Sequence, residues 1–266
     1  MASIISVHSF RGGTGKSNTT ANLASVVAAS GRRVGVIDGD IQSPGIHVLF
    51  GMAGDEVVGS LNDFLWHGRA IADVAHDVTD RVGGAIDGGR LFLIPSSMQP
   101  GEITRVLREG YDAQRLTEGI RELVDALDLD VLFIDTHPGL NEETLLSLVI
   151  SHVLLIVMRP DKQDFEGTGI TVRVARELEV PGIHIVVNKA PQQLDPEAVA
   201  RRVTEAYGCD VAAVLPHSDE LMGLASEGVF VLRHPDDPLS ARYRSLASRV
   251  VPALAGAGST TPSARA

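Results

Sequence analysis

Residues 9–18, SFRGGTGKSN, combine glycines, a lysine and hydroxyl side chains in a pattern suited to binding phosphate. An apolar run precedes them and a helix-forming segment follows, so backbone N–H groups and the positive end of the helix dipole would converge on phosphate oxygens. In such a loop Lys16 would contact the β- and γ-phosphates of a nucleotide, and the Ser17 hydroxyl would bind Mg²⁺. The other residues expected to line the phosphates are Gly12, Gly13, Thr14, Gly15 and Asn18. The alternative is a glycine-rich turn before an ordinary helix.

The loop departs at its beginning from the common pattern of Gly, four residues and Gly-Lys-Ser/Thr. Phe10 stands where the first glycine is expected, and Arg11 follows it beside a pair of glycines. The planar guanidinium of arginine is suited to bidentate contact with phosphate. Arg11 is therefore a second candidate cation for phosphate chemistry.

Three aspartates follow apolar segments that are typical of buried strands. Asp38 and Asp40 lie in VGVIDGDIQSPG, and Asp135 ends the strand-like run in DVLFIDTHPGL. Ligands bind at the carboxyl ends of strands in open α/β sheets, so these carboxylates are expected beside the phosphate loop. One can belong to the Mg²⁺ shell while another orients or deprotonates the attacking water. The alternative for Asp38 or Asp40 is a helix cap or turn residue.

Two further segments are candidates for contact with a base. Asn188 ends the strand-like run GIHIVVNKA, and an amide side chain offers both a donor and an acceptor to an adenine edge. Pro216 ends AVLPHSDEL at a point where backbone groups could line the base. For Asn188 the alternative is a turn residue.

Short apolar runs alternate with helix-like segments along the chain, which predicts a doubly wound, mainly parallel α/β sheet with helices on both faces. The predicted strands are Ile4–Ser9, Arg33–Asp38, Arg90–Pro95, Asp130–Thr136, His152–Met158, Ile183–Asn188 and Val211–Leu215. The predicted helices are Lys16–Ser30, Ala113–Leu127, Glu142–Ile150, Phe165–Leu178 and Pro196–Tyr207. Residues 51–89 are expected to form small helices on the rim. One domain over residues 1–255 and a disordered tail over residues 256–266 complete the prediction.

Composition excludes several functions. The chain has 266 residues, a formal net charge of -11 and a single cysteine, Cys209. A globally basic nucleic-acid binder is not expected, and neither an internal disulfide nor a cysteine metal cage can form within the chain. There is no signal-peptide pattern and no uncharged apolar run of the roughly 20 residues that span a bilayer. We therefore expect a cytoplasmic protein.

The segments FRGGTGKS, VIDGDIQSPG, FIDTHPGL, VVNK and VLPHSDEL occur in this order. With them the chain resembles the ParA/MinD family of deviant Walker A P-loop ATPases, from Ile4 to about Leu254. The resemblance implies an ATPase with ATP/ADP and Mg²⁺ as ligands. It further implies a homodimer formed with ATP, and an unidentified activator or cargo protein as partner.

Residue roles carry over from this resemblance position by position. Asp40 matches the water-activating aspartate of the family, and Asp38 and Asp135 match the carboxylates of its magnesium shell, with Ser17. Arg11 falls on the signature lysine that reaches the nucleotide of the partner subunit. The alternatives for Arg11 are a backbone anchor or weakened catalysis.

Members of the family serve different cellular functions, and the sequence argues against some of these functions for this chain. His137 replaces a proline that is common in the family, and we interpret it first as a structural histidine. Iron–sulfur carriers of the family need cysteine ligands from each subunit, which Cys209 alone cannot supply. The last helix, in PLSARYRSLASRVVPALAG, is interpreted as a packing helix, so no C-terminal membrane-targeting helix is evident.

Nonspecific DNA binding stays possible through surface arginines. They are Arg201, Arg202, Arg242, Arg244 and Arg249. Two other functions also stay open. One is a nucleotide-gated scaffold with little hydrolysis, and the other is a small-molecule ligase or kinase on the same fold.

Overall fold

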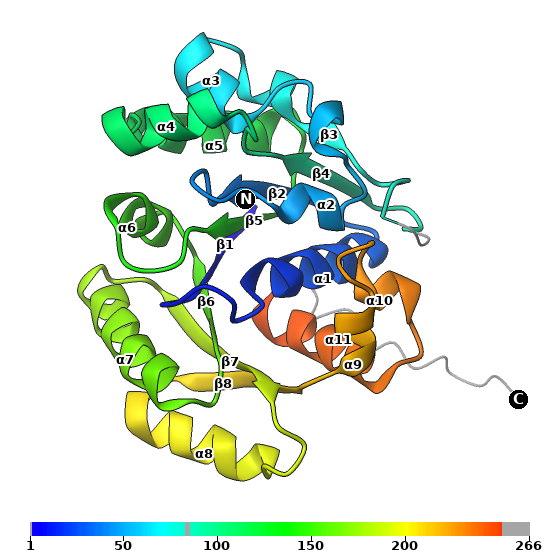
Figure 1. The fold of residues 1–266 in the computed structure, drawn as a ribbon, viewed down its shortest axis with the longest axis vertical. Coiled ribbons are helices and arrows are strands. Elements are labelled where there is room, and N and C mark those ends of the chain that lie inside the picture. Colours follow the sequence, from blue (N-terminus) through cyan, green and yellow to red (C-terminus); the bar gives the residue numbers. More distant parts are fainter. Residues whose placement is uncertain (1, 83–85, 252–266) are drawn as a thin grey trace, which may run out of the picture.

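The computed structural model describes residues 2–82 and 86–251. Within them, eight strands form one sheet in the order β3-β4-β2-β5-β1-β6-β7-β8 (Figure 1). The strands are β1 Ser3–His8, β2 Arg33–Gly39, β3 His76–Asp77, β4 Arg90–Ile94, β5 Val131–Thr136, β6 Val153–Met158, β7 Gly182–Ala190 and β8 Asp210–Pro216. All pairings are parallel except that of β3 with β4. The predicted doubly wound, mainly parallel sheet is confirmed.

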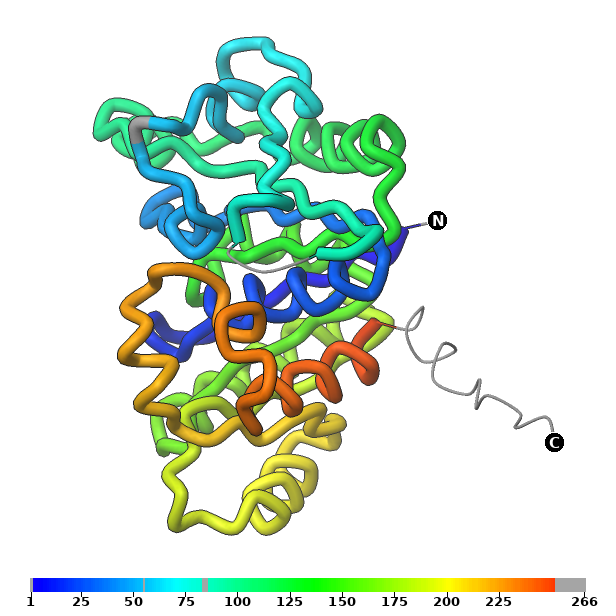
Figure 2. The backbone as a smooth tube through the Cα atoms, turned by 90° about the vertical axis from the view of Figure 1, so that its right-hand side faces the viewer, coloured from blue at the N-terminus to red at the C-terminus, as the bar shows by residue number. Residues whose placement is uncertain are grey.

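Helices cover both faces of the sheet, because the central strands are apolar on both sides. On one face lie α1 Lys16–Ala29, α2 Ile46–Leu49, α9 Asp219–Gly223, α10 Phe230–Arg233 and α11 Pro238–Val250. On the other lie α3 Leu61–His67, α4 Pro100–Glu109, α5 Ala113–Ala126, α6 Glu142–Val149, α7 Lys162–Glu177 and α8 Pro196–Tyr207. Figure 2 shows α1 and α11 side by side on the first face. The two layers bury the faces of the sheet and leave the carboxyl ends of its strands open to hold the site.

Helix α11 is a packing helix, as predicted. Its apolar face, with Leu239, Tyr243, Leu246 and Val250, is buried in the core. Its arginines cover the outer edge of β8, because Arg242 donates to the Val214 carbonyl and Arg249 to the Ala212 carbonyl, each at 3.1 Å. These bonds occupy carbonyls that an edge strand otherwise exposes.

Several elements differ from the prediction. Helix α7 begins at Lys162, three residues earlier than predicted, because the Asp161 side chain caps its first turn. Helix α4 begins with Pro100 at its first turn and was missed, as were the short helices α9 and α10. Residues 51–89 do contain small helices, η1 Gly54–Glu56, α3 and η2 Ile71–Val74, but also the two-residue strand β3. Only pairing with β4 makes β3 a strand.

In the described part of the chain, no helix is long and apolar enough to cross a membrane. The predicted tail, residues 256–266, and its boundary with the domain lie outside the described residues. These two predictions stay untested.

Candidate active site

The predicted phosphate loop connects β1 to α1. Gly13 and Gly15 have positive φ angles of 79° and 91°, which glycine adopts without strain. A Cβ atom on Gly15 would lie 2.4 Å from the Asn188 amide nitrogen. Helix α1 starts at Lys16 with no side-chain cap and no acidic residue in its first turn. Its free N–H groups are therefore available to an anion.

Lys16 and Asp135 form a buried ion pair at the end of the loop. The Lys16 ammonium lies 2.8 Å from Asp135 Oδ1, and the side chains are 7% and 1% exposed. Thr20, one turn further along α1, donates to the same oxygen at 3.0 Å. Removing one partner from a buried pair is costly, because the other charge is left unpaired. If Lys16 turns to a phosphate, Asp135 therefore needs another cation.

Asp38 adds a second buried carboxyl group beside this pair. It lies opposite Asp135 in the register of β2 and β5 and is 1% exposed. Burial raises the pKa of Asp38 to about 8, and the nearby charges of Asp135 and Asp40 also raise it, although Lys16 opposes them. Backbone N–H groups of Asp40 and Gly45 donate to its two oxygens, each at 3.2 Å.

This oxygen-rich arrangement fits a magnesium ion. In the described residues, no three His, Cys, Asp or Glu side chains form a self-sufficient metal site. Mg²⁺ at phosphate sites needs no such cage, because it keeps waters and phosphate oxygens among its ligands. Ser17 lies half-buried in the first turn of α1, at the same edge as Asp38 and Asp135. A divalent cation here would relieve the repulsion between the two buried carboxyl groups.

Asp40 lies just beyond β2 and pairs with a residue of another strand. His137, which follows β5, places its Nδ1 atom 2.6 Å from Asp40 Oδ1. The two side chains are 21% and 14% exposed. The Ser43 N–H group donates to the same Asp40 oxygen at 3.2 Å. His137 was interpreted from the sequence as a structural histidine, but it contacts a candidate catalytic carboxylate.

The end of β7 holds the loop from the other side. Asn188 donates from its amide to the Thr14 carbonyl at 2.8 Å, and Lys189 reaches the Gly13 carbonyl at 2.9 Å. The Asn188 donor, predicted to contact adenine, is thus engaged with the phosphate loop. Pro216 pairs with Ala190 in the neighbouring strand and lines a cavity of about 280 Å³.

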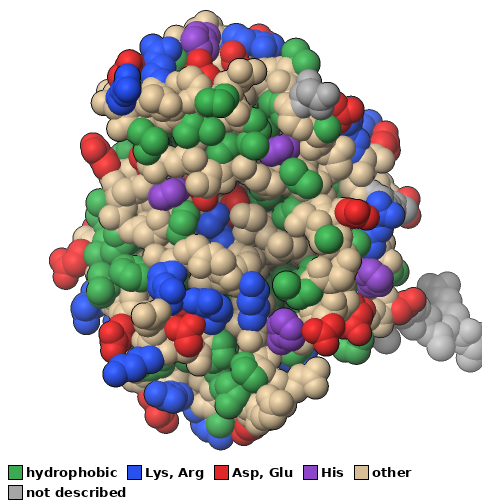
Figure 3. Space-filling view, viewed as in Figure 1, with side chains coloured by type: hydrophobic (Ala, Val, Ile, Leu, Met, Phe, Trp, Pro, Cys, Tyr) green, Lys and Arg blue, Asp and Glu red, His purple; other side chains and the backbone are tan. Residues whose placement is uncertain are grey.

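Arg11 lies on the outside of the loop, against the start of α7. Its guanidinium contacts Gln163 at 2.5 Å and lies 3.5 Å from Asp164, and its side chain is 40% exposed. Asp164 is itself buried and bonded to Arg159, which holds the pKa of Arg159 above its ordinary value. Figure 3 shows Lys and Arg side chains side by side on this face, with acidic side chains among them. Arg11 thus contacts residues of α7, whereas Lys16 pairs with Asp135.

Two contacts at the site were not predicted from the sequence. The Phe10 ring packs on Gly167 of α7, where a Cβ atom would lie 2.0 Å from the ring. His8, at the end of β1, is buried with Nδ1 2.8 Å from the Thr136 hydroxyl. Burial, and then the charges of Lys16 and His137, lower the pKa of His8 to about 3, so it is neutral. Phe10 in place of a glycine was the one sequence signal for these contacts.

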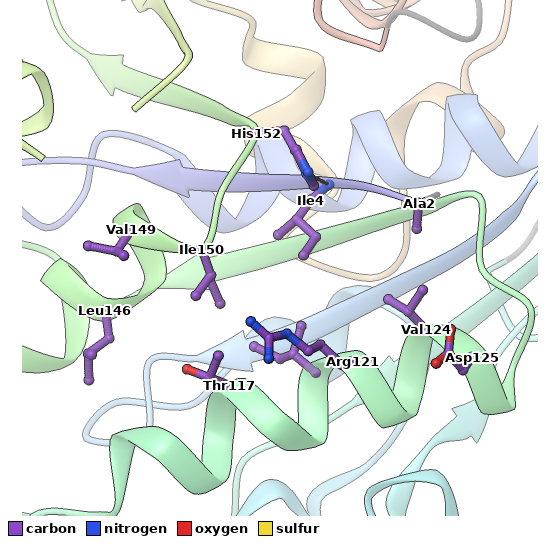
Figure 4. Close-up of a pocket in the computed structure, with 11 residues that line it drawn as sticks. Ala2, Ile4, Thr117, Arg121, Val124, Asp125, Leu146, Val149, Ile150 and His152 are labelled. Carbon is purple, nitrogen blue, oxygen red and sulfur yellow. Dashed lines mark hydrogen bonds between the residues drawn. The ribbon is translucent and has the colours of Figure 1, made fainter. Parts of the chain in front are cut away.

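A separate cavity lies at the opposite edge of the sheet. It has a volume of about 710 Å³ and is lined by residues of α5, α6 and the beginning of β1, including Ile4, Arg121 and His152 (Figure 4). His152 accepts a hydrogen bond from the Ile4 N–H group at 3.0 Å. Because β1 begins there and ends at the phosphate loop, this cavity is not part of the candidate active site.

A family model described as an AAA domain matches residues 2–179, more than half of the chain. MinD of Pyrococcus horikoshii, solved with Mg-ADP, has the same fold, with a TM-score of 0.75 and 22% identity over 98% of this chain and 100% of its own. The chain belongs to the ParA/MinD family of P-loop ATPases. The order of the motifs in this ParA/MinD-family chain agrees with the family match, and its enzymatic activity is that of an ATPase.

Curated relatives of this ParA/MinD-family ATPase differ in their names. An uncharacterized ATP-binding protein of Methanocaldococcus jannaschii is 26% identical over 94% of this chain and 88% of its own length. An iron–sulfur cluster carrier protein of Pseudomonas fragi is 27% identical over 92% of this chain and 83% of its own length. At this identity the names do not decide which output the ATPase serves.

Proposed function

We propose that the chain is an ATP-dependent dimerising switch, in which binding and hydrolysis of ATP control the recruitment of a partner or cargo. The observation that carries the proposal is the position of Arg11. Its guanidinium lies on the surface beside α7, while the phosphate loop and the candidate catalytic carboxylates lie at the same sheet edge. A cation in this place is available to a nucleotide held by a second copy of the chain.

The contacts of Arg11 permit such an exchange. The pair of Arg11 with Asp161 is exposed on both sides, and such pairs contribute only about 0–1 kcal/mol. Asp164 is buried, but it keeps its bonds to Arg159 when Arg11 leaves. Phosphate oxygens of a facing nucleotide offer the guanidinium bidentate, charge-assisted bonds that are stronger. Dimer formation with ATP would therefore draw Arg11 from α7 to the nucleotide of the partner.

Residues at the carboxyl ends of the strands have separate roles in ATP hydrolysis. The backbone N–H groups of the loop and Lys16 hold the phosphates of ATP, as the loop geometry supports. Ser17, Asp38 and Asp135 would hold Mg²⁺, which neutralises charge on the phosphate oxygens when bound. Asp40 orients the water that attacks the γ-phosphate. The bond from the γ-phosphorus to its bridging oxygen breaks, and ADP and inorganic phosphate leave.

The structure gives iron–sulfur transport no support in this chain. The single cysteine, Cys209, is buried just before β8, at the edge of the sheet opposite to the phosphate loop. Burial raises the pKa of its thiol, which disfavours the thiolate that a cluster needs. We therefore do not extend the name of the iron–sulfur carrier relatives to it.

Nonspecific DNA binding is also not the output that we propose. Arg201 lies within 3.9 Å of Asp195 and Glu197, Arg202 lies over the Phe165 ring, and Arg249 pairs with Asp210. A DNA phosphate would have to compete with these contacts within the chain. A protein partner or cargo is the simpler recipient of the ATP-dependent state.

Light scattering after size-exclusion chromatography tests the proposal. Asp40→Ala is expected to remain a dimer with ATP and Mg²⁺, because it binds ATP without hydrolysing it. Adding Arg11→Ala is expected to return the protein to the monomer mass, whereas adding Arg173→Ala, an exposed arginine further along α7, leaves the dimer intact. An unchanged mass of Asp40→Ala with and without ATP would contradict the switch.

A further inference from the structure

His137 differs from other histidines at this edge because it contacts a residue placed in the hydrolysis step. We propose that His137 is a positioning residue, which fixes the Asp40 carboxylate so that one of its oxygens is presented to the attacking water. This inference rests on the proposed role of Asp40. The contact of 2.6 Å between His137 Nδ1 and Asp40 Oδ1 is its main support.

The two oxygens of Asp40 have different surroundings. Oδ1 accepts both the His137 Nδ1–H bond and the backbone N–H bond of Ser43. Both bonds go to one oxygen, so they set the plane of the carboxylate and leave Oδ2 for the proton of a water molecule. Charge-assisted bonds of this length are strong enough to select one rotamer of a short side chain.

The backbone holds His137 firmly enough to act in this way. Its carbonyl accepts a bond from the Thr144 hydroxyl at 3.3 Å, at the start of α6. Two residues further, the Gly139 N–H group donates to the Ser9 carbonyl at 2.9 Å, at the start of the phosphate loop. The imidazole is therefore carried by a turn that is fixed to both the loop and the sheet.

An imidazole at position 137 can donate a hydrogen bond to Asp40, whereas the residue common in the family cannot. Proline, which the resemblance leads one to expect at this position, has no side-chain donor for Asp40. Asp40 itself lies beyond the end of β2, where no strand pairing restrains its side chain. In this chain the side-chain restraint comes from His137, across 97 residues of sequence, together with the Ser43 N–H group.

Two substitutions of nearly equal shape test the inference. The amide nitrogen of His137→Asn occupies about the place of Nδ1 and can donate to Asp40, whereas His137→Leu cannot donate. Misplacing a group that acts in the transition state lowers kcat more than it raises KM. We expect kcat of His137→Leu to fall about tenfold, with KM for ATP within about twofold. His137→Asn should stay within about threefold of the unchanged protein.

Controls separate this inference from the proposed function and from loss of folding. His184→Ala breaks a similar pair, with Asp210 at 3.2 Å, at the opposite edge of the sheet and should leave kcat unchanged. Thermal unfolding of the Asn and Leu variants shows whether they are equally folded. Equal kcat values for them, or a loss expressed in KM, would overturn the role of His137. Full activity of Asp40→Ala would instead refute the proposed role of Asp40.

Discussion

Gly167 lies on the side of α7 that faces the phosphate loop, and its lack of a side chain is expected to be essential there. A Cβ atom at this position would lie 2.0 Å from Phe10 Cδ1 and 2.4 Å from its Cγ atom, so the ring must move. Overpacking of this kind typically costs about 1–3 kcal/mol. Because Phe10 directly precedes Arg11, its displacement should also disturb the loop and weaken ATP binding.

A neighbouring glycine of the same helix provides the control. In Gly169→Ala the new Cβ atom would lie 3.3 Å from the Tyr207 ring edge, which needs only a small adjustment. Both substitutions gain about 1 kcal/mol from the better helix propensity of alanine, so this contribution cancels between them. Gly167→Ala should therefore have a free energy of unfolding about 2 kcal/mol lower than that of Gly169→Ala.

Urea unfolding measures this difference, and titration with a slowly hydrolysed ATP analogue measures nucleotide affinity. Adding Phe10→Ala to Gly167→Ala should recover most of the stability difference, because it removes the ring that the new methyl group meets. Equal unfolding free energies for the two glycine variants would refute the reasoning. The reasoning would also be refuted if Gly167→Ala lowered the free energy of unfolding as much in the Phe10→Ala variant as in the protein with Phe10.

Three further predictions concern the site. Lys16→Ala should lower kcat/KM for ATP by about 100-fold in a phosphate-release assay, because it removes the positive charge that the loop itself places on the β- and γ-phosphates. The folded protein keeps Asp38 protonated up to pH about 8, whereas the unfolded chain ionises it near pH about 4. The free energy of unfolding should therefore decrease as the pH rises from about 4 to about 8, as measured by urea titrations with EDTA. The decrease should be steeper than for Asp38→Asn. Gln163→Ala, which removes one exposed contact of Arg11, should change the ATP-dependent dimerisation constant less than about fivefold in analytical ultracentrifugation, because such contacts are weak.

Much of the fold could be predicted from local sequence. Runs such as VLFIDT and VLLIVM are apolar on both faces, and this alone indicates strands covered by helices on both sides. The gathering of Asp38 and Asp135 at the phosphate loop also followed from sequence, because parallel strands place their carboxyl ends at one edge. The elements that were missed, such as β3, depend on a neighbouring strand rather than on their own residues.

The sequence by itself thus determined the type of fold, the phosphate loop and the set of carboxylates, because each depends on short-range pattern and strand direction. Only the tertiary structure placed His137 on Asp40, Arg11 on α7 and Phe10 on Gly167. Each of these contacts joins segments about 100 or more residues apart, as the separations of 97 and 152 residues for the first two show. Such contacts depend on the relative position of packed elements, which no local pattern of residues specifies.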